Sequence, residues 1–429
     1  MATTTKTLVL AGDGGNFIER LNAARITSSG AHASFPLVNL VDRQPDSPWI
    51  DSAAGADRVI TVNLNHVWDG QMEALALDGL SVDGWTFTLN GAGTGATATW
   101  TTSFSPPEGT RCMNIFTGNA GGATKGGVAT AQFYVLRGTT GRFRSRLQSN
   151  GTATIALRFY DPARGKYLTS GGAWTTTPTD FQATTSATWV SSGDVLATIE
   201  AAPATRYDLD VATIQVQIIS STTANINQQA DDVRFFPEFD TAALFGHNLD
   251  VATCELRTST DAFAANDVLW NAPTIYKPSF YYSNTTKQTA SYFRVKFPGT
   301  NSAPIGVGEL YLGQRLALMR KPGWPRVRVR EDLVRPLPWR AYAISDDPMR
   351  EVEFPFDYFG TEWDEARDRV WARSRNGLHP MVVIPNDTDP TVCIFGRIQR
   401  DLEFQHLTTA VRKGASLALL ESPFWTLVP

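Results

Sequence analysis

The stretch Ile214-Gln215-Val216-Gln217-Ile218-Ile219 decides the fold class of this chain, because apolar and polar residues alternate along it. A period of two places the apolar side chains on one face of a β-strand and the polar side chains on the other. The same alternation recurs between clusters of Gly, Asn, Thr and Pro at 85–89, 131–136 and 155–160. We therefore predict that residues 68–237 form an antiparallel β-sandwich or jelly roll.

Strand-like segments also occur on both sides of this region. The β-branched run at 59–64 is typical of a strand, and prolines before it exclude a helix. Residues 243–249 and 305–313 continue the pattern after the region ends. We predict one discontinuous β-domain, made of residues 1–67 plus 238–320, with the sandwich 68–237 inserted into it.

The last quarter of the chain has a different pattern. Residues 351–356 are predicted to form a strand, and Thr361 is a suitable N-cap for a helix at 362–375. Asn376-Gly377 then supplies a C-terminal stop. We predict a small α+β domain at 321–429, and a chain that is mostly β as a whole.

Bulk properties exclude several classes of protein. The chain has 429 residues with a net charge of -4, which gives no reason to expect nucleic acid as a partner. The N-terminal apolar run Thr7–Leu10 is too short for a signal peptide, and no segment reaches the length of a membrane span. Cys112, Cys254 and Cys393 lack metal-binding spacing, so we predict that they are buried as small hydrophobic residues. We expect synthesis in the cytoplasm and no membrane insertion.

The sequence predicts that the protein is not an enzyme. Its five histidines are scattered, and no nucleophile, P-loop or dinucleotide motif occurs. A glycan-cleaving activity stays open as an alternative, because two catalytic carboxylates are brought together only by the fold. The acidic residues of the predicted sandwich that could supply such a pair are Asp161, Asp180, Asp194, Glu200, Asp208 and Asp210.

Aromatic residues of the predicted sandwich are candidates for binding sugars, since the apolar faces of sugars stack on aromatic rings. Three of them lie in or near the polar, Gly-rich stretch 161–177 and are expected to be exposed; the alternative is that two or three of the set belong to the core. The candidates are Tyr160, Tyr167, Trp174, Trp100 and Trp189.

The two flanking pieces together resemble the discoidin-like (F5/8 type C) jelly rolls found on phage virion proteins. The resemblance is carried by Phe35-Pro36 with Asn39-Leu40, by Trp49, by 245–249 (Phe-Gly-His-Asn-Leu) and by the ending 306–313. It implies a jelly roll in which the strand near Val62 would lead almost directly to the strand near Leu244.

The inserted region resembles carbohydrate-binding modules of the sandwich kind. It opens with Asp83-Gly84-Trp85 and closes with a strand that contains Asp231-Asp232. The resemblance implies glycan binding and a structural calcium held by Asp231 or Asp232. One carboxylate pair alone does not define a calcium site, because calcium takes six to eight oxygen ligands.

The C-terminal region resembles tail-tube-like and distal-tail proteins of siphophages. The relevant residues are Phe354-Pro355-Phe356, Trp363, Trp371, the strand 380–385 and Gly396-Arg397-Ile398. The resemblance implies a virion structural protein of the tail tip or baseplate. It would form a homo-oligomeric ring or trimer, contact other virion proteins and present the inserted module to glycans on the host surface. The alternatives are a non-adhesive capsid or tail decoration (cement) protein and the glycan-cleaving enzyme.

Overall fold

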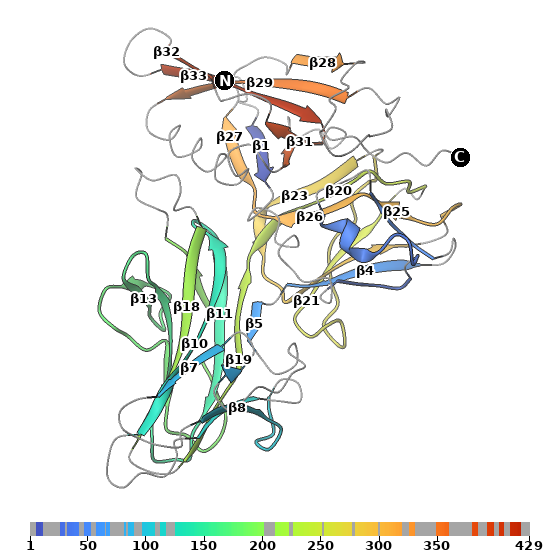
Figure 1. The fold of residues 1–429 in the computed structure, drawn as a ribbon. Coiled ribbons are helices and arrows are strands. Elements are labelled where there is room, and N and C mark those ends of the chain that lie inside the picture. The colour runs from blue at the N-terminus through green and yellow to red at the C-terminus, as the bar shows by residue number, and fades with distance from the viewer. Residues whose placement is uncertain are drawn as a thin grey trace, which may run out of the picture. The chain divides into compact units, whose positions relative to one another are not determined.

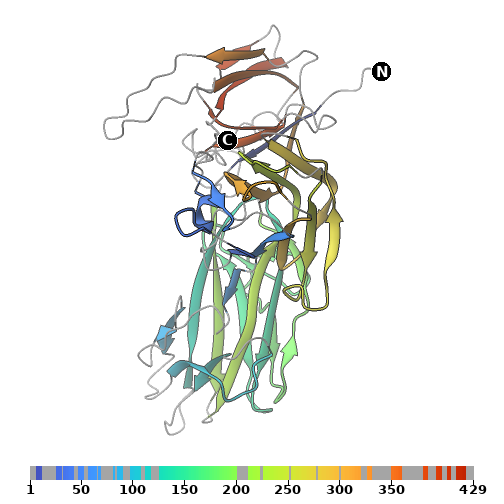
Figure 2. The same cartoon turned by 90° about the vertical axis from the view of Figure 1, so that its right-hand side faces the viewer.

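The structure is a computed structural model, and Figures 1 and 2 show its fold from two sides. It describes residues 6–11, 26–30, 32–42, 47–52, 57–64, 66–68, 81–82, 85–89, 97–107, 112–116, 125–200, 211–222, 226–250, 253–276, 279–298, 301–319, 326–330, 349–359, 380–384, 393–398, 403–406 and 412–421. The chain divides into two compact units. We call Asn65–Ala202 with Val211–Pro237 the sandwich unit. We call Met1–Leu64, Pro203–Asp210 and Glu238–Pro429 the split unit.

The sandwich unit contains two antiparallel sheets, whose long strands run side by side in Figure 2. The first, which we call the tyrosine sheet, has the order β14-β13-β12-β18-β10-β7-β6, with β15 paired to β12. Its strands are β6 (Ser81–Val82), β7 (Trp85–Leu89), β10 (Lys125–Leu136), β12 (Ile155–Asp161), β13 (Lys166–Leu168), β14 (Trp174–Thr175), β15 (Gln182–Thr184) and β18 (Val211–Thr222).

The second sheet, which we call the arginine sheet, has the order β16-β11-β19-β9-β8. Two further strands, β17 and β5, pair with β11 and β19. Its strands are β5 (His66–Trp68), β8 (Thr97–Thr101), β9 (Cys112–Phe116), β11 (Thr140–Gln148), β16 (Val190–Ser191), β17 (Val195–Thr198) and β19 (Asn227–Pro237).

The core of the sandwich unit lies between these two sheets. Phe143 of β11 packs against Phe159 of β12 and Phe235 of β19, with ring centroids 4.8 Å apart in both pairs. All three rings are fully buried. Alternation along each strand therefore sends one set of side chains into this core and the other set to the opposite face.

Three small sheets form the centre of the split unit. A five-stranded sheet runs β2-β4-β24-β21-β22, a three-stranded sheet runs β23-β20-β26, and β25 pairs with β3. Their bounds are β2 (Ile26–Ser28), β3 (Trp49–Ile50), β4 (Arg58–Asn63), β20 (Phe239–Phe245), β21 (Glu255–Ser259), β22 (Val268–Asn271), β23 (Ser279–Gln288), β24 (Tyr292–Phe297), β25 (Gly306–Val307) and β26 (Glu309–Gly313), and a short 3-10 helix, η2, spans Leu37–Leu40.

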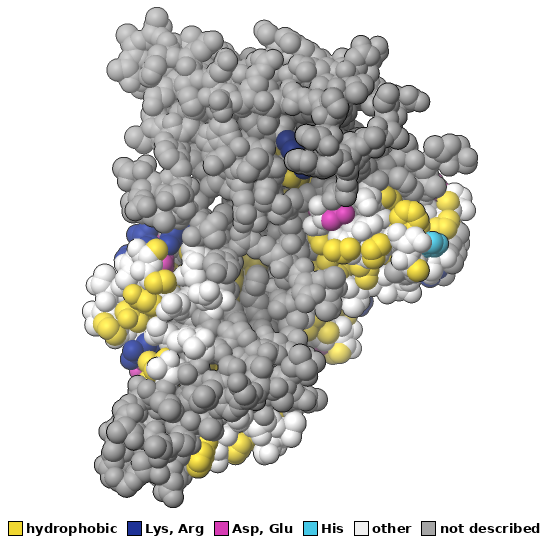
Figure 3. Space-filling model, in the orientation of Figure 1, with side chains coloured by type: hydrophobic (Ala, Val, Ile, Leu, Met, Phe, Trp, Pro, Cys, Tyr) yellow, Lys and Arg dark blue, Asp and Glu magenta, His cyan; other side chains and the backbone are white. Residues whose placement is uncertain are grey.

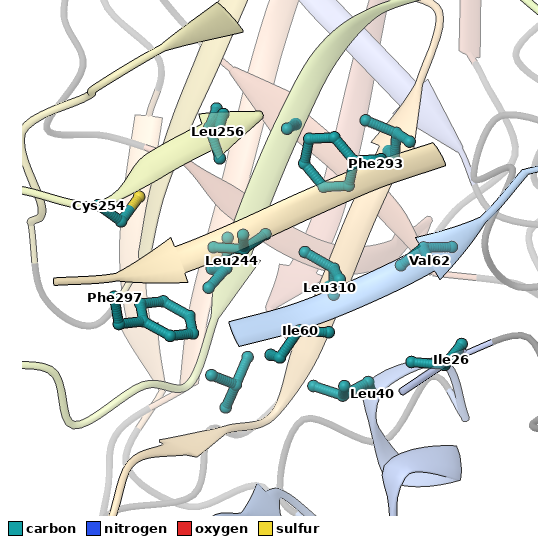
Figure 4. Packing of buried hydrophobic residues seen from close by; sticks show 14 of the residues in the cluster. Ile26, Leu40, Ile60, Val62, Leu244, Cys254, Leu256, Phe293, Phe297 and Leu310 are labelled. Carbon is teal, nitrogen blue, oxygen red and sulfur yellow. The ribbon is translucent and has the colours of Figure 1, made fainter. Parts of the chain in front are cut away.

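The core of the split unit joins segments that lie far apart in the sequence. Val62 of β4 is paired with Phe293 of β24, and Ile60 with Val295. Figure 4 shows Ile60, Val62, Leu244, Phe293 and Leu310 gathered in this core, together with other buried side chains. Residues on either side of the sandwich unit thus complete one hydrophobic core.

A further eight-stranded sheet, the C-terminal sheet, has the order β27-β1-β30-β31-β33-β29-β28, with β32 paired to β33. Its strands are β1 (Lys6–Ala11), β27 (Leu316–Met319), β28 (Arg326–Arg330), β29 (Met349–Phe359), β30 (Met381–Ile384), β31 (Ile394–Ile398), β32 (Glu403–His406) and β33 (Arg412–Glu421). Phe395 of β31 packs on Phe245 of β20, with ring centroids 5.1 Å apart. This contact joins the C-terminal sheet to the three-stranded sheet inside the split unit.

One feature of the C-terminal sheet differs from the sequence prediction. Strand β1 lies between β27 and β30, so residues that we assigned to two different domains share one sheet. The apolar run Thr7–Leu10 suits a strand with neighbours on both edges. The described residues of 321–429 are all strand or single connecting positions, which gives no support to an α+β domain, and the expected helix at 362–375 lies outside the described residues.

The prediction of a mostly β chain containing a β-sandwich is confirmed. The prediction that the three cysteines are buried is confirmed as well. Within the described ranges, no helix combines the length and the apolar character needed to cross a bilayer.

Candidate functional site

The outer face of the tyrosine sheet carries a row of polar and aromatic side chains. On β12, Leu157 and Phe159 enter the core, so Arg158 and Tyr160 lie on the opposite face. On β18, Val216 and Ile218 enter the core, which places Gln215 and Gln217 outside. In the register of this pair, Tyr160 is opposite Gln215 and Arg158 is opposite Gln217.

The row continues across the neighbouring strands, because directly opposed residues of an antiparallel pair share a face. One line across the sheet consists of Gln132, Gln215, Tyr160, Tyr167 and Thr175. A second line, two residues further along the strands, consists of Thr86, Thr130, Gln217 and Arg158. We call these two lines together the tyrosine face.

The two tyrosines of this face stack on each other. Tyr160 and Tyr167 are paired across β12 and β13, with ring centroids 4.6 Å apart and planes at 27°. Both side chains are half-buried. Where β13 lies in Figure 1, the surface in Figure 3 shows hydrophobic side chains next to Lys or Arg. The pair therefore offers ring surface to solvent beside polar groups.

Ion pairs hold the hairpin that carries Tyr167. Arg137 binds Asp161 through two hydrogen bonds, of 2.6 and 3.2 Å, and both side chains are buried. Lys166, at the start of β13, donates to Glu200 at 2.6 Å. The buried bidentate pair has a defined geometry, so it fixes the end of β12, whereas the partly exposed Lys166–Glu200 pair contributes less.

Polar side chains of the tyrosine face contact one another as well. Arg158 donates from Nε to Asp180 at 2.6 Å, and Gln217 donates to Gln215 at 3.4 Å. The guanidinium charge on this face is thus balanced by a neighbouring carboxylate. Amide groups then supply donors and acceptors without adding net charge.

The structure places Trp174 on the core side of the sheet. It is paired with Leu168, a core residue, and its ring meets that of Phe143 edge-on with centroids 6.5 Å apart. Its Nε1 donates to the carbonyl of Thr198 at 2.9 Å. Trp174 therefore covers the edge of the core and lies on the opposite side of the sheet from Tyr167.

The other two tryptophans do not extend this stack. Trp189 is half-buried, and its Nε1 donates to the carbonyl of Phe104 at 3.1 Å. Trp100 is paired with Met113 in the arginine sheet, and its side chain lies outside the described part of the chain. Of the five aromatic candidates, the structure brings together Tyr160 and Tyr167.

Asp232, one of the two carboxylates considered for calcium, lies among guanidinium groups. The register of β11 and β19 shifts between Arg144 and Arg146, and Asp232 adopts a positive φ of 51° there. Its carboxylate is fully buried, lies 3.1 Å from Arg146 and 3.6 Å from Arg144, and also contacts Arg234. These cations already supply the positive charge beside Asp232, and they would repel a divalent ion.

Asp231 is buried in the same strand, and its charge affects the thiol of Cys112. Burial, with a further contribution from the charge of Asp231, raises the pKa of Cys112 to about 12. The thiol is therefore protonated at neutral pH. Among the described residues no group of three or more His, Cys, Asp or Glu side chains is arranged to hold a metal ion.

The four described carboxylates among those considered for glycan cleavage each form an ion pair with a basic side chain. Asp161 pairs with Arg137, Asp180 with Arg158, Asp194 with Arg144, and Glu200 with Lys166 and Arg164. Asp208 and Asp210 lie outside the described residues. A glycosidase directs two carboxyl groups at one bond from opposite sides, whereas these four are directed at separate cations.

The polar half of the tyrosine face was not among the predicted site residues. Gln215 and Gln217 belong to the very stretch whose alternation predicts the fold, but their partners across the sheet depend on register. Gln132 and Arg158 join them only through strand pairing. The sequence signal for this half of the face was the pair of uncharged polar residues, Gln215 and Gln217, that alternate with the core residues of β18.

The fold of the sandwich unit defines a class, an antiparallel β-sandwich in which one sheet has an outer face rich in amides and tyrosine. No family model and no curated protein matches the chain. Among solved structures, a xylan-binding domain of carbohydrate-binding module family 22 is similar, at 14% identity over 37% of this chain and 88% of that chain, with a TM-score of 0.23.

Two other solved structures are similar at the same low level. A family 61 carbohydrate-binding module in complex with beta-1,4-galactotriose shares 14% identity over 35% of this chain and 88% of that chain, with a TM-score of 0.23. A beta-1,2-glucanase from Parabacteroides distasonis shares 10% identity over 56% of this chain and 37% of that chain, with a TM-score of 0.20. At these TM-scores the function has to be inferred from the residues of the chain itself.

Proposed function

We propose that the protein binds a glycan on the tyrosine face, and that it is a tailed-phage virion protein that displays this face to the host surface. The observation that carries the binding proposal is the stacked pair Tyr160 and Tyr167 in line with Gln215 and Gln132. Ring surface beside amide groups suits a sugar, which has an apolar face and a rim of hydroxyls.

The dimensions and charge of the face favour an extended, neutral glycan. Five positions cross five adjacent strands, and strands about 4.8 Å apart give a line of about 19 Å. Because Arg158 is already paired with Asp180, recognition would rest on hydrogen bonds and stacking, without a free charge. A chain of several sugar units would fit along such a line.

The virion part of the proposal rests on the sequence resemblances to discoidin-like and tail proteins of phages. A single shallow sugar site binds weakly, but several copies on one particle bind a surface strongly through multivalency. Homo-oligomerisation and contact with other virion proteins are accordingly part of the proposal.

The test measures binding of the full-length protein to immobilised neutral polysaccharides from candidate host surfaces. Tyr167→Ala should weaken binding roughly tenfold, as expected for the loss of one aromatic stacking contact. Leu196→Ala is the matched control, since Leu196 is 46% exposed on β17 of the arginine sheet. Thermal melting of each variant separates lost binding from lost folding.

Three results would contradict the glycan proposal or redirect it. Equal binding by Tyr167→Ala and Leu196→Ala would show that the tyrosine face is not the site. Binding to no polysaccharide would favour a non-adhesive decoration protein. Release of new reducing ends from a bound polysaccharide would identify an enzyme.

A further inference from the structure

The turn between β11 and β12 presents an exposed Asn-Gly pair, Asn150-Gly151. The side-chain oxygen of Asn150 accepts a hydrogen bond from the backbone N–H of Thr152 at 3.1 Å and from that of Ala153 at 3.3 Å. The Thr152 hydroxyl donates to the same oxygen at 2.9 Å. Three donors therefore converge on one amide carbonyl at the protein surface.

The conformation of the turn explains why these two residue types occur together. Gly151 has a φ of +90°, which a residue with a side chain adopts only with strain. Asn150 closes the turn by accepting from the backbone two residues ahead, as asparagine commonly does. The turn thus places an exposed amide directly before a residue that has no Cβ to block its nitrogen.

We propose that Asn150 is a self-modification site, at which the chain loses ammonia through a cyclic imide. The backbone nitrogen of Gly151 gives up its proton and bonds to Cγ of Asn150, and the bond from Cγ to Nδ2 breaks as ammonia leaves. Water then opens the five-membered imide at either carbonyl. One opening leaves an ordinary aspartate at this position and the other leaves isoaspartate; no oxidant or reductant takes part.

The three donors are what distinguish this asparagine from an ordinary one. As the nitrogen attacks, negative charge develops on the side-chain oxygen of Asn150, and donors already aimed at that oxygen stabilise it. The backbone N–H of Gly151 has no acceptor among the described residues, so no hydrogen bond has to be broken first.

The two products have different consequences for the turn. The aspartate product keeps an oxygen for the same three donors, and its charge strengthens such hydrogen bonds. Isoaspartate adds one atom to the main chain between Ser149 and Ala153. Those residues are joined by a hydrogen bond of 2.6 Å, and Gln228 donates to both of them. The isoaspartate form should therefore disturb these hydrogen bonds among Ser149, Ala153 and Gln228, whereas the aspartate form should keep them.

The test follows the amide of Asn150 in the full-length protein by peptide mass spectrometry during incubation at neutral pH and physiological temperature. The wild type should gain one oxygen from heavy-oxygen water at position 150, as aspartate and isoaspartate. Thr152→Val removes one donor and should slow conversion roughly two- to tenfold, the rate effect of one hydrogen bond. Thr152→Ser retains the hydroxyl and should react like the wild type.

Asn90-Gly91 and Asn376-Gly377 serve as internal references in the same digest. The proposal is overturned if Asn150 keeps its amide while a urea-unfolded sample of the chain converts, or if Thr152→Val reacts as fast as the wild type. The Asn150→Asp variant supplies the melting temperature expected for the aspartate product. An aged sample rich in isoaspartate should melt below that value, and an unchanged melting temperature would contradict the predicted effect on the turn.

Discussion

At the scale of single residues, the carboxylate of Asp232 compensates part of the positive charge on the arginine sheet. Three alternate positions of β11 carry Arg142, Arg144 and Arg146, which a flat sheet would leave as a repulsive row. The hydrogen bond that Arg144 donates to Asp194, together with the charge of Asp232, raises the pKa of Arg144 above its ordinary value. Asp232 is the buried counter-ion of this group.

Asp232→Asn should lower the free energy of unfolding by about 2–3 kcal/mol, because it leaves several partly buried guanidinium groups without their shared carboxylate. Asp194→Asn is the matched control: it removes a carboxylate from the same Arg144, but one that is 33% exposed, so about 1 kcal/mol or less should be lost. Urea unfolding measures both values. Equal losses would contradict the role of Asp232.

Calcium removal tests whether Asp232 serves as a calcium ligand instead of a counter-ion for arginine. If guanidinium groups supply the charge beside Asp232, a chelator should leave the melting temperature of the wild type unchanged. A clear fall in melting temperature on chelation, reversed by added calcium, would instead support the calcium ligand role suggested for Asp231 or Asp232.

At the scale of elements, the β13–β14 hairpin connects the core to the tyrosine face. Its alternate residues point in opposite directions: Leu168 and Trp174 cover the core, and Tyr167 and Thr175 face outward. The position of this hairpin thus sets the position of Tyr167.

Gly172→Ala should disturb the hairpin and weaken glycan binding together with stability. Gly172 has a φ of +84°, and a Cβ there would lie 2.3 Å from the carbonyl oxygen of Leu196. Gly193→Ala is the control, because Gly193 has a φ of +71° but no atom within 4 Å of its Cβ position. The control should cost about 1 kcal/mol from backbone strain alone. Thermal melting and polysaccharide binding should both rank the wild type first, Gly193→Ala second and Gly172→Ala last.

At the scale of the whole molecule, each unit has its own hydrophobic core and contains buried cysteine. Cys112 lies in the sandwich unit, and Cys254 and Cys393 lie in the split unit; all three are buried. Burial raises the pKa of the Cys112 and Cys254 thiols, so these two are protonated and poorly reactive at neutral pH.

Thiol labelling in increasing urea should therefore report on each unit separately. Neither Cys112 nor Cys254 should be modified in the native protein, and each should react when its own unit unfolds. Asp161→Asn breaks the buried pair with Arg137 and should shift the labelling of Cys112 to lower urea, with little effect on Cys254. Equal shifts at both cysteines would show that the units unfold as one.

The parts of the molecule that could be predicted are those governed by local pattern. Alternation at 155–160 and 214–219 places Phe159 and Val216 in the core, as the structure shows. The orientation of Trp174 could not be predicted from local sequence. Its polar, Gly-rich surroundings suggested exposure, but the two-residue strand that contains it turns the ring toward Phe143. The role of Asp232 depends on a bulge and on arginines about 90 residues away in sequence, neither of which a local pattern contains.

The place of β1 in the C-terminal sheet sets an order for folding on the ribosome. Strand β1 is made long before its two neighbours, which are residues 316–319 and 381–384. It stays unpaired while the whole sandwich unit is synthesised, because both of its partner strands follow that unit in the sequence. Pairing over such separations is slow and leaves strand edges exposed. Nascent chains released before residue 381 should therefore carry a finished sandwich and an unfinished sheet that is prone to aggregation.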